Sequence, residues 1–571
     1  MYKFSISDTK NGFKTISVIS SAGKEIKLHS SYDPIKEAER NIDTFDKGRS
    51  SIIIVSGVAL GYHIKFLKEK YPDIKIVAVE KEKEIQLKCN EYYPETLSDT
   101  PVINSLRDIE SIFSNIDLPN FKGIAHYIHK PSYQLNQEFY DEIADNIKLY
   151  ISSRISDLLT RFEFEEKWIE NIFKNLKHIE HSTDVAQLFG KFRDIPGVIV
   201  SAGPSLKNNV EELKKIKDKA VIVAVDTSLK ILANHNIEPH FVLTLDAQKH
   251  SIKHFSGIKP KNTILIADIV SCPSILNSYN GEKIISTTSK YYQDPDGNTI
   301  RETTPMIDWI EKKSLPLGDI QSGGSVSTSA FDLLLNMGCN PVILVGQDLA
   351  YTGREYHCSG TYHNDDWIPG INRFLNLDTI NQNIIRKRSF KYVRSYGGKG
   401  LVISDYVFDL YKSWFEDSAG RVPVTVVNSS GGGAKVNNTT EMSLYDGVNL
   451  GKKNVNPSSI IEKIISNKTD RNIDRVKKAL AVEYKKLNLI DTSDNLDDNT
   501  MKKINSALSD DETNELLRPL MRKTEFYLAR HEFEADKERT IFFNDIKLAV
   551  RKVKKFIESS GMIESEQRVK T

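Results

Sequence analysis

Residues 196–206 read Pro-Gly-Val-Ile-Val-Ser-Ala-Gly-Pro-Ser-Leu, and this stretch decides the class of fold. Its apolar run stops at small residues, beginning with Ser201, as a buried parallel strand does. Gly203 and Pro204 then break the chain, and Ser205 stands where the N-cap residue of a helix belongs. A loop of small residues that enters a helix presents backbone N–H groups to an anion, most often phosphate. We therefore expect a strand, a ligand-binding loop and a charged helix.

The same alternation continues beyond this loop. After the helix, expected over 207–217, a strand over 220–225 ends in Asp226, and a strand over 241–245 ends in Asp246. This β-α-β-α-β order predicts an open α/β sheet, whose ligands bind at the carboxyl edge of the strands. The alternative is a sheet whose glycines only permit tight turns, because such loops carry a weak signal by themselves.

A second informative stretch, residues 321–330, contains five hydroxyl side chains and two glycines ahead of an expected helix over 331–337. The glycines let the backbone approach a ligand. Ser325 is placed to cap the helix, whose N-terminus carries a partial positive charge. An apolar strand over 342–345 follows and leads to Asp348, again at the carboxyl edge. The alternative is a serine-capped helix and an aspartate that only turns the chain.

The polar segment 352–370 carries two histidines, His357 and His363. Histidine titrates near neutral pH, so either one is a candidate general base for the proton of an attacking hydroxyl. The alternative for each is a surface histidine in a mobile loop. A metal pair is not expected, because Asp365 and Asp366 complete no recognisable ligand spacing.

A short apolar strand over 424–427 leads into Asn428 and three consecutive glycines, 431–433. Three glycines after a buried strand are typical of a flexible turn.

An earlier part of the chain has a similar strand and loop pattern, but its nucleotide-binding fingerprint is incomplete. The strand over 51–56 enters a loop with Gly57 and Gly61, and the strand over 74–79 ends in Glu80. Dinucleotide and methyl-donor folds hold a ribose with an acidic residue about twenty positions after the glycines. The third glycine of that fingerprint is missing and the loop carries bulky side chains. We therefore expect a nucleotide-binding-like fold without activity.

The remaining segments are short-stranded or helical. Apolar and polar residues alternate in 1–30, which indicates an antiparallel strand pair, and apolar residues recur at helical spacing before and after the central body. The last helix has a basic face that is either a solvated helix surface or a docking surface for a protein acceptor. That face comprises Arg551, Lys552, Lys554 and Lys555. The expected domains are a β-rich start with a Rossmann-like domain (1–135), a helical connector (136–192), a catalytic Rossmann-like domain (193–440) and a helical C-terminal domain (441–571).

The composition bounds the class of function. The chain has 571 residues, a net charge of +1 and 39% apolar residues, which is ordinary for a soluble multidomain protein and gives no reason to expect nucleic-acid binding. No apolar run approaches the length that spans a membrane, and no signal peptide opens the chain. The four cysteines lie far apart without zinc-site spacing, which favours reduced thiols in a cytoplasmic protein.

Several of these motifs together resemble one protein family. The run 201–206, with Ala-Val-Asp at 224–226 and Leu-Thr-Leu-Asp at 243–246, resembles the central domain of the Maf (motility accessory factor) flagellin glycosyltransferases. The Gly-Gly-Ser of 323–325 and the Gly-Gln-Asp-Leu-Ala-Tyr of 346–351 match further motifs of that family. The Gly-Pro-Ser-Leu core also resembles the nucleotide-binding loop of bacterial sialyltransferases that use CMP-sugars.

The resemblance covers most of residues 30–440. It implies an α/β fold with a central Rossmann-like domain of the sialyltransferase type, a second Rossmann-like domain before it and an all-helical C-terminal domain after it. The implied activity is cytoplasmic transfer of a nonulosonic (sialic-acid-like) sugar from a CMP donor to Ser/Thr hydroxyls of flagellin, as flagellum assembly and motility require. We expect no resident cofactor and no metal, because no Asp-x-Asp motif lies at a strand end.

Carried onto this chain residue by residue, the resemblance implies a set of site residues. The predicted catalytic residues are His357, which matches a histidine of the family pattern, Asp348, whose carboxylate suits an oxocarbenium-like transition state, and His363, the second histidine of the same segment. The implied donor contacts are Ser201, Gly203, Pro204, Ser205, Asp226, Thr227, Asp246, Ser322, Gly323, Gly324, Ser325, Gly346, Tyr351, Asn428 and Gly432. The stretch after 428 departs from the family pattern, which has an acidic residue before its glycines.

Two other functions remain open from the sequence. A related domain family, which transfers diphosphate from ATP to a hydroxymethylpterin, shares the Gly-Pro-Ser-Leu opening and needs Mg²⁺ to neutralise the transferred group. The large flanking domains are hard to explain for so small an acceptor. The other alternative is a non-catalytic chaperone that binds flagellin and keeps the fold without the chemistry.

Overall fold

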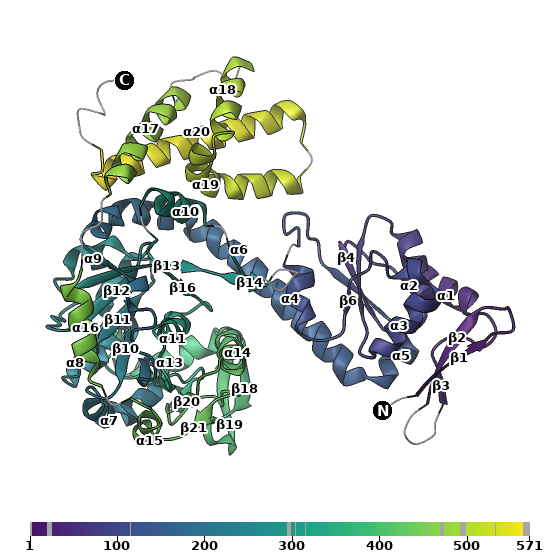
Figure 1. Ribbon diagram of the computed structural model, residues 1–571, viewed down its shortest axis with the longest axis horizontal. Coiled ribbons are helices and arrows are strands. Elements are labelled where there is room, and N and C mark those ends of the chain that lie inside the picture. The colour runs from purple at the N-terminus through teal and green to yellow at the C-terminus, as the bar shows by residue number, and fades with distance from the viewer. Residues whose placement is uncertain are drawn as a thin grey trace. The chain divides into compact units, whose positions relative to one another are not determined.

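The computed structural model divides the chain into two compact units. Unit 1 comprises residues 1–163, 293–298 and 522–539, and unit 2 comprises 164–292, 299–521 and 540–571. Figure 1 draws the chain coloured along its length. The residues that the structure describes are 3–19, 25–114, 116–293, 299–302, 304–314, 316–453, 455–468, 473–491, 498–531 and 533–563.

Unit 1 opens with a small antiparallel sheet. Strand β1 (Lys3–Asp8) pairs with β2 (Lys14–Ile19), which in turn pairs with β3 (Glu25–Lys27). The predicted strand pair is thus confirmed, with β3 as an addition. Ile16 and Val18 alternate along β2 and are fully buried, because alternate residues of a strand face the same side.

The larger sheet of unit 1 has four parallel strands in the order β6-β5-β4-β7. Strand β4 is buried along its whole length and β5 along all but its first residue, as a sheet covered on both faces requires. The strands are β4 (Ile52–Ser56), β5 (Lys75–Val79), β6 (Val102–Ile103) and β7 (Ile124–Ile128), and the helices are α1 (Pro34–Asp43), α2 (Tyr62–Lys70), α3 (Lys83–Tyr92), α4 (Asp108–Phe113) and α5 (Lys130–Leu135).

Unit 2 contains the predicted α/β body. Its main sheet is parallel, in the order β16-β13-β12-β11-β10-β9-β17-β20-β21, and β8 pairs with β13 at the side of this path. The strands are β8 (Thr183–Asp184), β9 (Gly197–Val200), β10 (Val221–Val225), β11 (Phe241–Thr244), β12 (Ile264–Asp268), β13 (Lys283–Ser289), β16 (Asp319–Gln321), β17 (Val342–Val345), β20 (Val426–Asn428) and β21 (Thr440–Glu441), and a separate pair comprises β14 (Tyr291–Gln293) and β15 (Thr299–Arg301).

The order of the strands reverses at β9. Strands β10 to β13 add successively on one side of β9, whereas β17 adds on its other side. In open α/β sheets this reversal leaves a crevice outside the carboxyl ends of the two central strands, where ligands bind. The loops after β9 and β17 are among the segments in which the sequence predicts a site.

Helices cover both faces of this sheet, and each face has its own apolar core. On one face, alternate residues of β9 and β10 pack with Phe331 of α11 and Phe415 of α14. On the other face they pack with Leu213 of α7, Ile231 of α8 and Leu444 of α15. The helices are α7 (Val210–Lys215), α8 (Asp226–Asn234), α9 (Pro273–Ser278), α10 (Pro305–Lys313), α11 (Val326–Asn336), α12 (Tyr362–Trp367), α13 (Leu377–Arg386), α14 (Tyr406–Arg421) and α15 (Leu444–Asn449).

The prediction for the first helix of this body was partly wrong. Instead of a continuous helix over 207–217, the chain forms a 3-10 turn, η3 (Pro204–Asn208), and then α7. Gly203 occupies the cap position of η3, and Ser205 lies inside the turn. The physical reason is that the Ser205 side chain donates to a carboxylate from another strand end, so it does not cap its own helix.

A long helix and a C-terminal helical region complete the chain. Helix α6 (Gln137–Ile179) continues from the end of the first parallel sheet to the start of unit 2. In unit 2 its last two turns share one apolar core with the C-terminal helices, through Phe173 and Phe556 among others. The C-terminal helices are α16 (Pro457–Ser466), α17 (Asp474–Asp491), α18 (Asp498–Leu508), α19 (Asp511–Arg530) and α20 (Ala535–Ser560).

The basic face of α20 is largely paired with carboxylates. Arg551 and Lys554 both contact Asp491, and Lys552 contacts Glu166. These are ion pairs on a helix surface, which contribute little to stability by themselves. The observation favours the solvated-surface interpretation over a docking surface.

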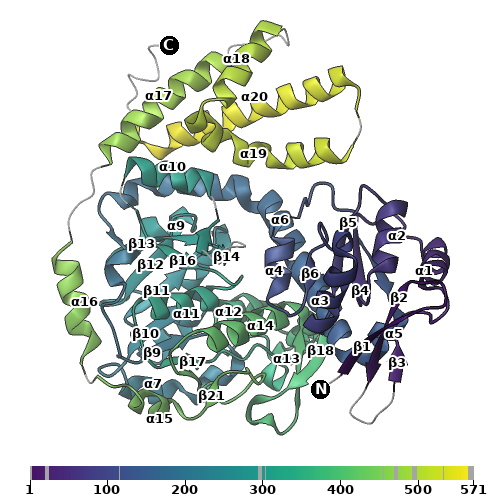
Figure 2. The same cartoon turned by 45° about the vertical axis from the view of Figure 1, so that its right-hand side comes forward.

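A two-stranded hairpin lies beside the α/β body and was not predicted. Strand β18 (Phe390–Arg394) pairs antiparallel with β19 (Leu401–Asp405), and α14 begins directly after β19. Figure 2 shows the hairpin next to α13 and α14. In the described part of the chain, no helix is both long and apolar enough to cross a membrane.

Candidate functional site

The loop after β9 is held by an aspartate from the loop after β17. The backbone N–H and the hydroxyl of Ser205 both donate to the carboxylate of Asp348, the former at 3.1 Å from Oδ2. Burial raises the pKa of Asp348, while these hydrogen bonds oppose the rise because they stabilise the charged form. The anion bound to this loop is therefore the protein's own carboxylate.

Glycines make this contact possible. A Cβ atom on Gly203 would lie 2.3 Å from Oδ1 of Asp348 and 2.4 Å from the carbonyl oxygen of Gly346. Gly203 N–H donates to that same carbonyl at 2.8 Å. Gly346 has a φ of +64°, and Leu349, with a φ of +51°, adopts a conformation that is uncommon for residues other than glycine. The turn at Asp348 is thus a strained and closely packed part of the sheet edge.

Ser201 joins these two loops to the start of α11. Its hydroxyl donates to Oε1 of Gln347 at 2.6 Å and lies 2.9 Å from the hydroxyl of Ser327. All three side chains are buried. The loops after β9 and β17 and the first turn of α11 therefore meet at the point where the strand order reverses.

Helix α11 is capped as predicted but starts earlier than predicted. Ser325 accepts from the N–H of Thr328, and the Thr328 hydroxyl accepts from the N–H of Ser325, which together form a capping box. Within the described residues, no acceptor is bonded to the backbone N–H of Val326 or Ser327. These two amides are unsatisfied donors at a helix N-terminus, where the dipole favours a negative charge.

The Gly-Gly motif ahead of α11 packs against aromatic rings of α14. A Cβ atom on Gly323 would lie 2.5 Å from the indole ring of Trp414, and one on Gly324 would lie 3.1 Å from the ring of Tyr411. Gly324 also has a φ of +96°, which favours glycine. The Ser322 hydroxyl accepts from the Gly324 N–H at 3.2 Å. The motif is therefore shaped by close packing.

The next two strand ends carry aspartates whose oxygens are already bonded. Asp226 accepts from the N–H and hydroxyl of Thr227 and, through Oδ2, from the hydroxyl of Thr244 at 2.8 Å. Asp246 accepts from the hydroxyl of Ser251 at 2.5 Å within its own loop. Among the described residues, the Asp246 side chain makes no hydrogen bond to the loops after β9 and β17, so it belongs to a neighbouring part of the same edge.

The two predicted histidines lie together, and a third joins them. The rings of His357 and His363 stack with centroids 5.1 Å apart, and the ring of His254 lies 6.1 Å from that of His363. The backbone N–H of Cys358 donates to the carbonyl of Ala202, which anchors the His357 segment to the loop after β9. Sequence reasoning missed His254, because it lies more than a hundred residues before the other two.

All three histidines have pKa values below that of an ordinary histidine. Burial lowers the pKa of His357 to about 3 and that of His363 to about 4, and neighbouring imidazoles add to both effects. Burial also lowers the pKa of His254, while Asp226 and Asp246 oppose that shift. At neutral pH all three rings are uncharged, and the lowered pKa values make them weaker bases than an ordinary histidine. Among the described residues, the Nδ1 atom of His254 is buried without a hydrogen-bond partner.

Tyr351 leads from the loop after β17 to the hairpin. Its hydroxyl donates to Asp405, whose other oxygen caps α14 through the N–H of Phe408 at 2.8 Å. Burial raises the pKa of Tyr351, and the Asp405 carboxylate raises it further. Tyr351 is only 1% exposed, so it supports the site from behind.

Arg388 is a cation at this edge that the sequence analysis did not select. Its guanidinium lies over the ring of Tyr356, donates to that hydroxyl at 3.3 Å and is 3.8 Å from Asp405. The Tyr356 ring is 4.4 Å from that of His357. A tyrosine beside the two candidate histidines and an arginine 32 residues later were the only available signals, and neither has a characteristic spacing.

The last predicted segment, which follows β20, packs next to Asp348. Asn428 is fully buried, accepts from the N–H of Ser430 at 3.1 Å, and has an Nδ2 atom without a partner among the described residues. A Cβ atom on Gly432 would lie 3.0 Å from the Cβ atom of Ser205, and one on Gly433 would lie 2.2 Å from the carbonyl oxygen of Asp348. These glycines are required by close approach, so the stretch is a packed turn.

The corresponding edge of unit 1 is filled by its own side chains. Glu80 accepts from the N–H of Val58 at 3.0 Å, and burial raises its pKa to about 7. A Cβ atom on Gly57 would lie 2.2 Å from that of Ser132, and the rings of His63 and His129 stack at 4.5 Å beside it. This packing accords with the expectation of a nucleotide-binding-like fold without activity, which stays a prediction.

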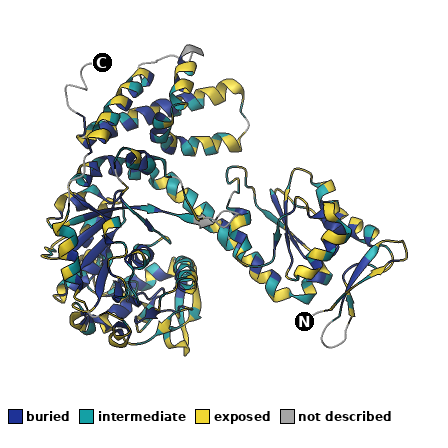
Figure 3. Ribbon diagram, viewed as in Figure 1, coloured by how far each residue is buried: buried dark blue, intermediate teal, exposed yellow. Residues whose placement is uncertain are grey.

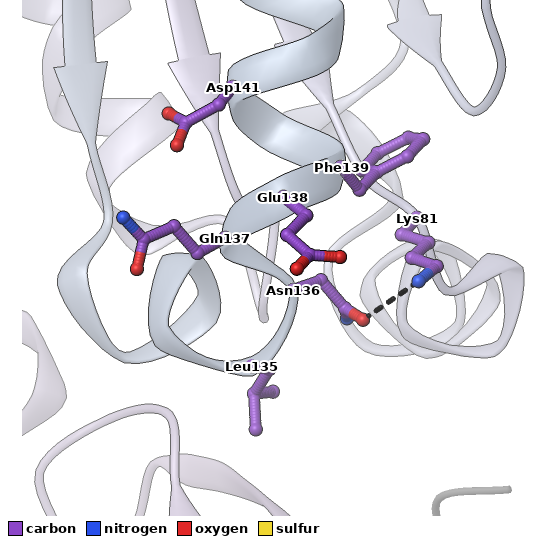
Figure 4. A pocket seen from close by; sticks show the side chains of 7 residues that line it. All are labelled: Lys81, Leu135, Asn136, Gln137, Glu138, Phe139 and Asp141. Carbon is purple, nitrogen blue, oxygen red and sulfur yellow. Dashed lines mark hydrogen bonds between the residues drawn. The ribbon is translucent and has the colours of Figure 1, made fainter. Parts of the chain in front are cut away.

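A hollow of about 520 Å³ does lie in unit 1, near the start of α6. Its one cation, Lys81, donates to Oδ1 of Asn136 at 3.1 Å (Figure 4). The lining residues are Lys81, Leu135, Asn136, Gln137, Glu138, Phe139 and Asp141. None of the predicted site residues is among them. In the ranges that the structure describes, no group of three or more His, Cys, Asp or Glu side chains is arranged to hold a metal ion.

Comparisons with known proteins bear on the fold. A family model described as 6-hydroxymethylpterin diphosphokinase MptE-like matches residues 170–354. Two uncharacterized proteins of Treponema pallidum (strain Nichols) are similar, one with 27% identity over 161 residues and one with 26% over 93. The matched segments span 28% and 43% of those two proteins, respectively.

A solved structure agrees with this chain over nearly its whole length. The Maf glycosyltransferase from Magnetospirillum magneticum AMB-1 superposes with a TM-score of 0.53 and 13% identity, covering 97% of this chain and 90% of the other. The expected resemblance to the Maf proteins is therefore confirmed at the level of fold, including the α/β class and the helical C-terminal region.

Proposed function

We propose that this chain is a glycosyltransferase that moves a nonulosonic sugar from a CMP donor to Ser/Thr hydroxyls of flagellin in the cytoplasm. The observation that carries the proposal is the arrangement of loops and α11 at the place where the strand order of the unit 2 sheet reverses. There, the unsatisfied amides of Val326 and Ser327 lie beside the loops after β9 and β17, to which the His357 segment is anchored. An anion site next to neutral histidines suits transfer from a phosphate leaving group to a hydroxyl.

The reaction follows from these groups. The bond between the sugar's anomeric carbon and the phosphate oxygen breaks, and its electron pair stays on CMP. The N-terminus of α11 stabilises that developing charge through its amides and dipole. The acceptor oxygen forms the new bond to the anomeric carbon, and its proton goes to the imidazole of His357 or His363. The carboxylate of Asp226 stabilises the positive charge of the oxocarbenium-like transition state.

In this scheme Asp348 has a positioning role. Both of its oxygens are close to Ser205, so the carboxylate holds the loop after β9 through hydrogen bonds. The earlier assignment of Asp348 as a catalytic residue thus becomes the more specific proposal that it fixes the loop on which the donor lies.

The pyrophosphokinase alternative is favoured by one observation, the family model over 170–354. That match leaves unit 1 and the C-terminal helices without a role. The Maf structure accounts for both, since it superposes on 97% of the chain. We therefore rank the glycosyltransferase first.

The test is the intact mass of flagellin after incubation with this protein and a CMP-nonulosonic acid, in EDTA and separately in Mg²⁺. We expect mass increments of whole sugar residues in both buffers, because the proposed chemistry uses no metal. Donor-free incubation is the control. An unchanged flagellin mass, together with AMP release from ATP and a hydroxymethylpterin in Mg²⁺, would establish the alternative. Flagellin retained without chemistry of either kind would support the chaperone.

A further inference from the structure

The hairpin of β18 and β19 has two different faces. On its inner face the paired residues Val393 and Val402 pack against the core of unit 2, and the Ser404 hydroxyl donates to the carbonyl of Leu349 at 2.9 Å. Opposed residues of an antiparallel pair lie on the same side, so the pairs 392–403 and 394–401 lie on the outer face.

This outer face is apolar and uncovered. Tyr392 is 61% exposed, Leu401 is 68% exposed and Phe390, at the end of the same row, is 53% exposed. The exposed residues are most of β18 and the first residue of β19, at the side of the α/β body (Figure 3). Monomeric proteins rarely leave adjoining large apolar side chains in water, and such patches mark interaction surfaces.

The surrounding stretch has further apolar side chains and a strong positive charge. Residues 368–406 contain seven lysines and arginines against two aspartates, a net charge of +5 in a chain whose total is +1. Arg394 and Lys399 have no carboxylate within 4.0 Å among the described residues. The seven exposed large apolar residues of this stretch are Ile368, Ile371, Phe374, Phe390, Tyr392, Leu401 and Tyr406.

The hairpin is bonded directly to the candidate site. The backbone N–H of Tyr351 donates to the carbonyl of Ile403 at 2.8 Å, and the Tyr351 hydroxyl donates to Asp405. On the other strand, the N–H of Lys435 donates to the carbonyl of Arg394 at 2.8 Å. Both strands are therefore fixed to loops that form the site, one after β17 and one after β20.

We propose that the outer face of the β18–β19 hairpin is the docking surface for the protein acceptor. The partner that fits it is an acidic polypeptide segment with apolar side chains, because the face is apolar and its unpaired charges are positive. The inference rests on the proposed function, since it names the part of the enzyme that holds the acceptor while a hydroxyl reaches the histidines.

The experiment compares two double variants. Tyr392→Ser with Leu401→Ser removes the apolar face. Tyr445→Ser with Leu450→Ser is the matched control, because these residues are 55% and 48% exposed at α15. For each, the affinity for flagellin, the KM and kcat of transfer, the affinity for CMP and the thermal unfolding midpoint are measured.

The hairpin variant is expected to raise KM for flagellin about tenfold or more, with kcat at saturating acceptor and CMP affinity unchanged. The control variant is expected to match the wild type. A third variant, Arg394→Glu, is expected to weaken flagellin binding several-fold at low salt and little at high salt, because it acts through a screened charge. This variant also tests the surface if the double variant unfolds.

Three results would overturn the inference. An unchanged KM in both hairpin variants would show that acceptor binds elsewhere and would leave the transferase proposal intact. A wild-type dimer that dissociates on hairpin substitution would make the face a contact between two copies. Wild-type protein that binds CMP but no flagellin would remove the acceptor and this docking surface together, while the donor half of the proposed function would survive.

Discussion

In both parallel sheets of this molecule, a carboxylate accepts a hydrogen bond from the glycine-containing loop after a strand, but the surroundings of that contact differ. In unit 1 the Glu80 carboxylate accepts from the N–H of Val58, in the glycine-containing loop after β4. In unit 2 the Asp348 carboxylate accepts from the N–H of Ser205, in the glycine-containing loop after β9. Each loop is thus held by an acid from a neighbouring strand end.

The difference lies in what surrounds that contact. In unit 1 the side chains of Ser132, His63 and His129 pack against the loop and fill the edge. In unit 2 a second element, α11, brings an N-terminus with two unsatisfied amides to the same place. A glycine loop after a strand therefore does not by itself distinguish an edge filled by side chains from one that faces a helix N-terminus. The side chains and helices behind it decide that.

The largest expected effect is at the two glycines that permit close approach. Gly203→Ala places a methyl group against Asp348 and the Gly346 backbone, so we expect CMP affinity to fall about a hundredfold or more, as measured by calorimetry. Gly57→Ala, with a clash against Ser132 at a positive φ, should lower the stability of unit 1 and leave CMP affinity unchanged. Equal loss of CMP affinity in both variants would remove the distinction between the sheets.

Removal of the candidate base is expected to have the next largest effect. His357→Ala should slow transfer about 10² to 10⁴-fold, the usual contribution of a general base, with CMP affinity kept. His363→Ala is the internal comparison, since the two rings stack. If transfer survives His357→Ala and fails with His363→Ala, the assignment passes to His363.

Acidification should destabilise unit 1 through its buried histidines. Burial lowers the pKa of His63 to about 4, and those of His29 and His129 are also well below the ordinary value of about 6.5. The unfolded chain therefore binds protons first. The stability that neutral His63 contributes is complete above pH ~6.5 and is lost towards pH ~4, by up to ~3 kcal/mol. The contributions of His29 and His129 are likewise lost as the pH falls below ~6.5.

Glu80 works in the opposite direction, because its pKa is raised to about 7 and its penalty grows as pH rises from ~4.5. Three histidines outweigh one glutamate, so a net loss on acidification is expected. Hydrogen exchange of β4 and β5 at pH 7 and pH 5 measures it. His63→Leu should flatten the dependence, and an unaltered dependence would show that His63 is not its source.

The smallest expected effect compares the cations of the two edges. Lys81 in unit 1 is bonded to Asn136, whereas Arg388 in unit 2 is partly exposed and 3.8 Å from its nearest carboxylate. Arg388→Lys keeps the charge but loses the planar fork, so CMP should bind about three- to tenfold more weakly. Lys81→Arg should change nothing. Equal CMP affinity in Arg388→Lys would exclude Arg388 from the donor site.

Much of the α/β body was predictable because its strands are buried on both faces. Continuous apolar runs such as 198–200 and 342–345 predicted β9 and β17 to within a residue or two. The capping role of Ser325 was predictable, because a cap is a contact between residues only three positions apart. Patterns of this range are visible in a sequence.

Contacts across long separations were not visible. Ser205 and Asp348 are 143 residues apart, and nothing near Ser205 indicates that its hydroxyl is taken by a carboxylate. The hairpin was missed for a different reason. Its residues 390–394 are mostly exposed, so they lack the apolar alternation by which a half-buried strand is recognised. Asp405 followed by an apolar helix was the one readable signal there.

The packing of Trp414 against Gly323 has an optical consequence. The chain has four tryptophans, and this is the one whose indole ring touches the loop ahead of α11. A nucleotide on that loop alters the polarity and water content around the ring, to which indole emission responds. The protein thus has its own chromophore at the proposed donor site, and we expect that binding of CMP can be followed by intrinsic fluorescence without a label.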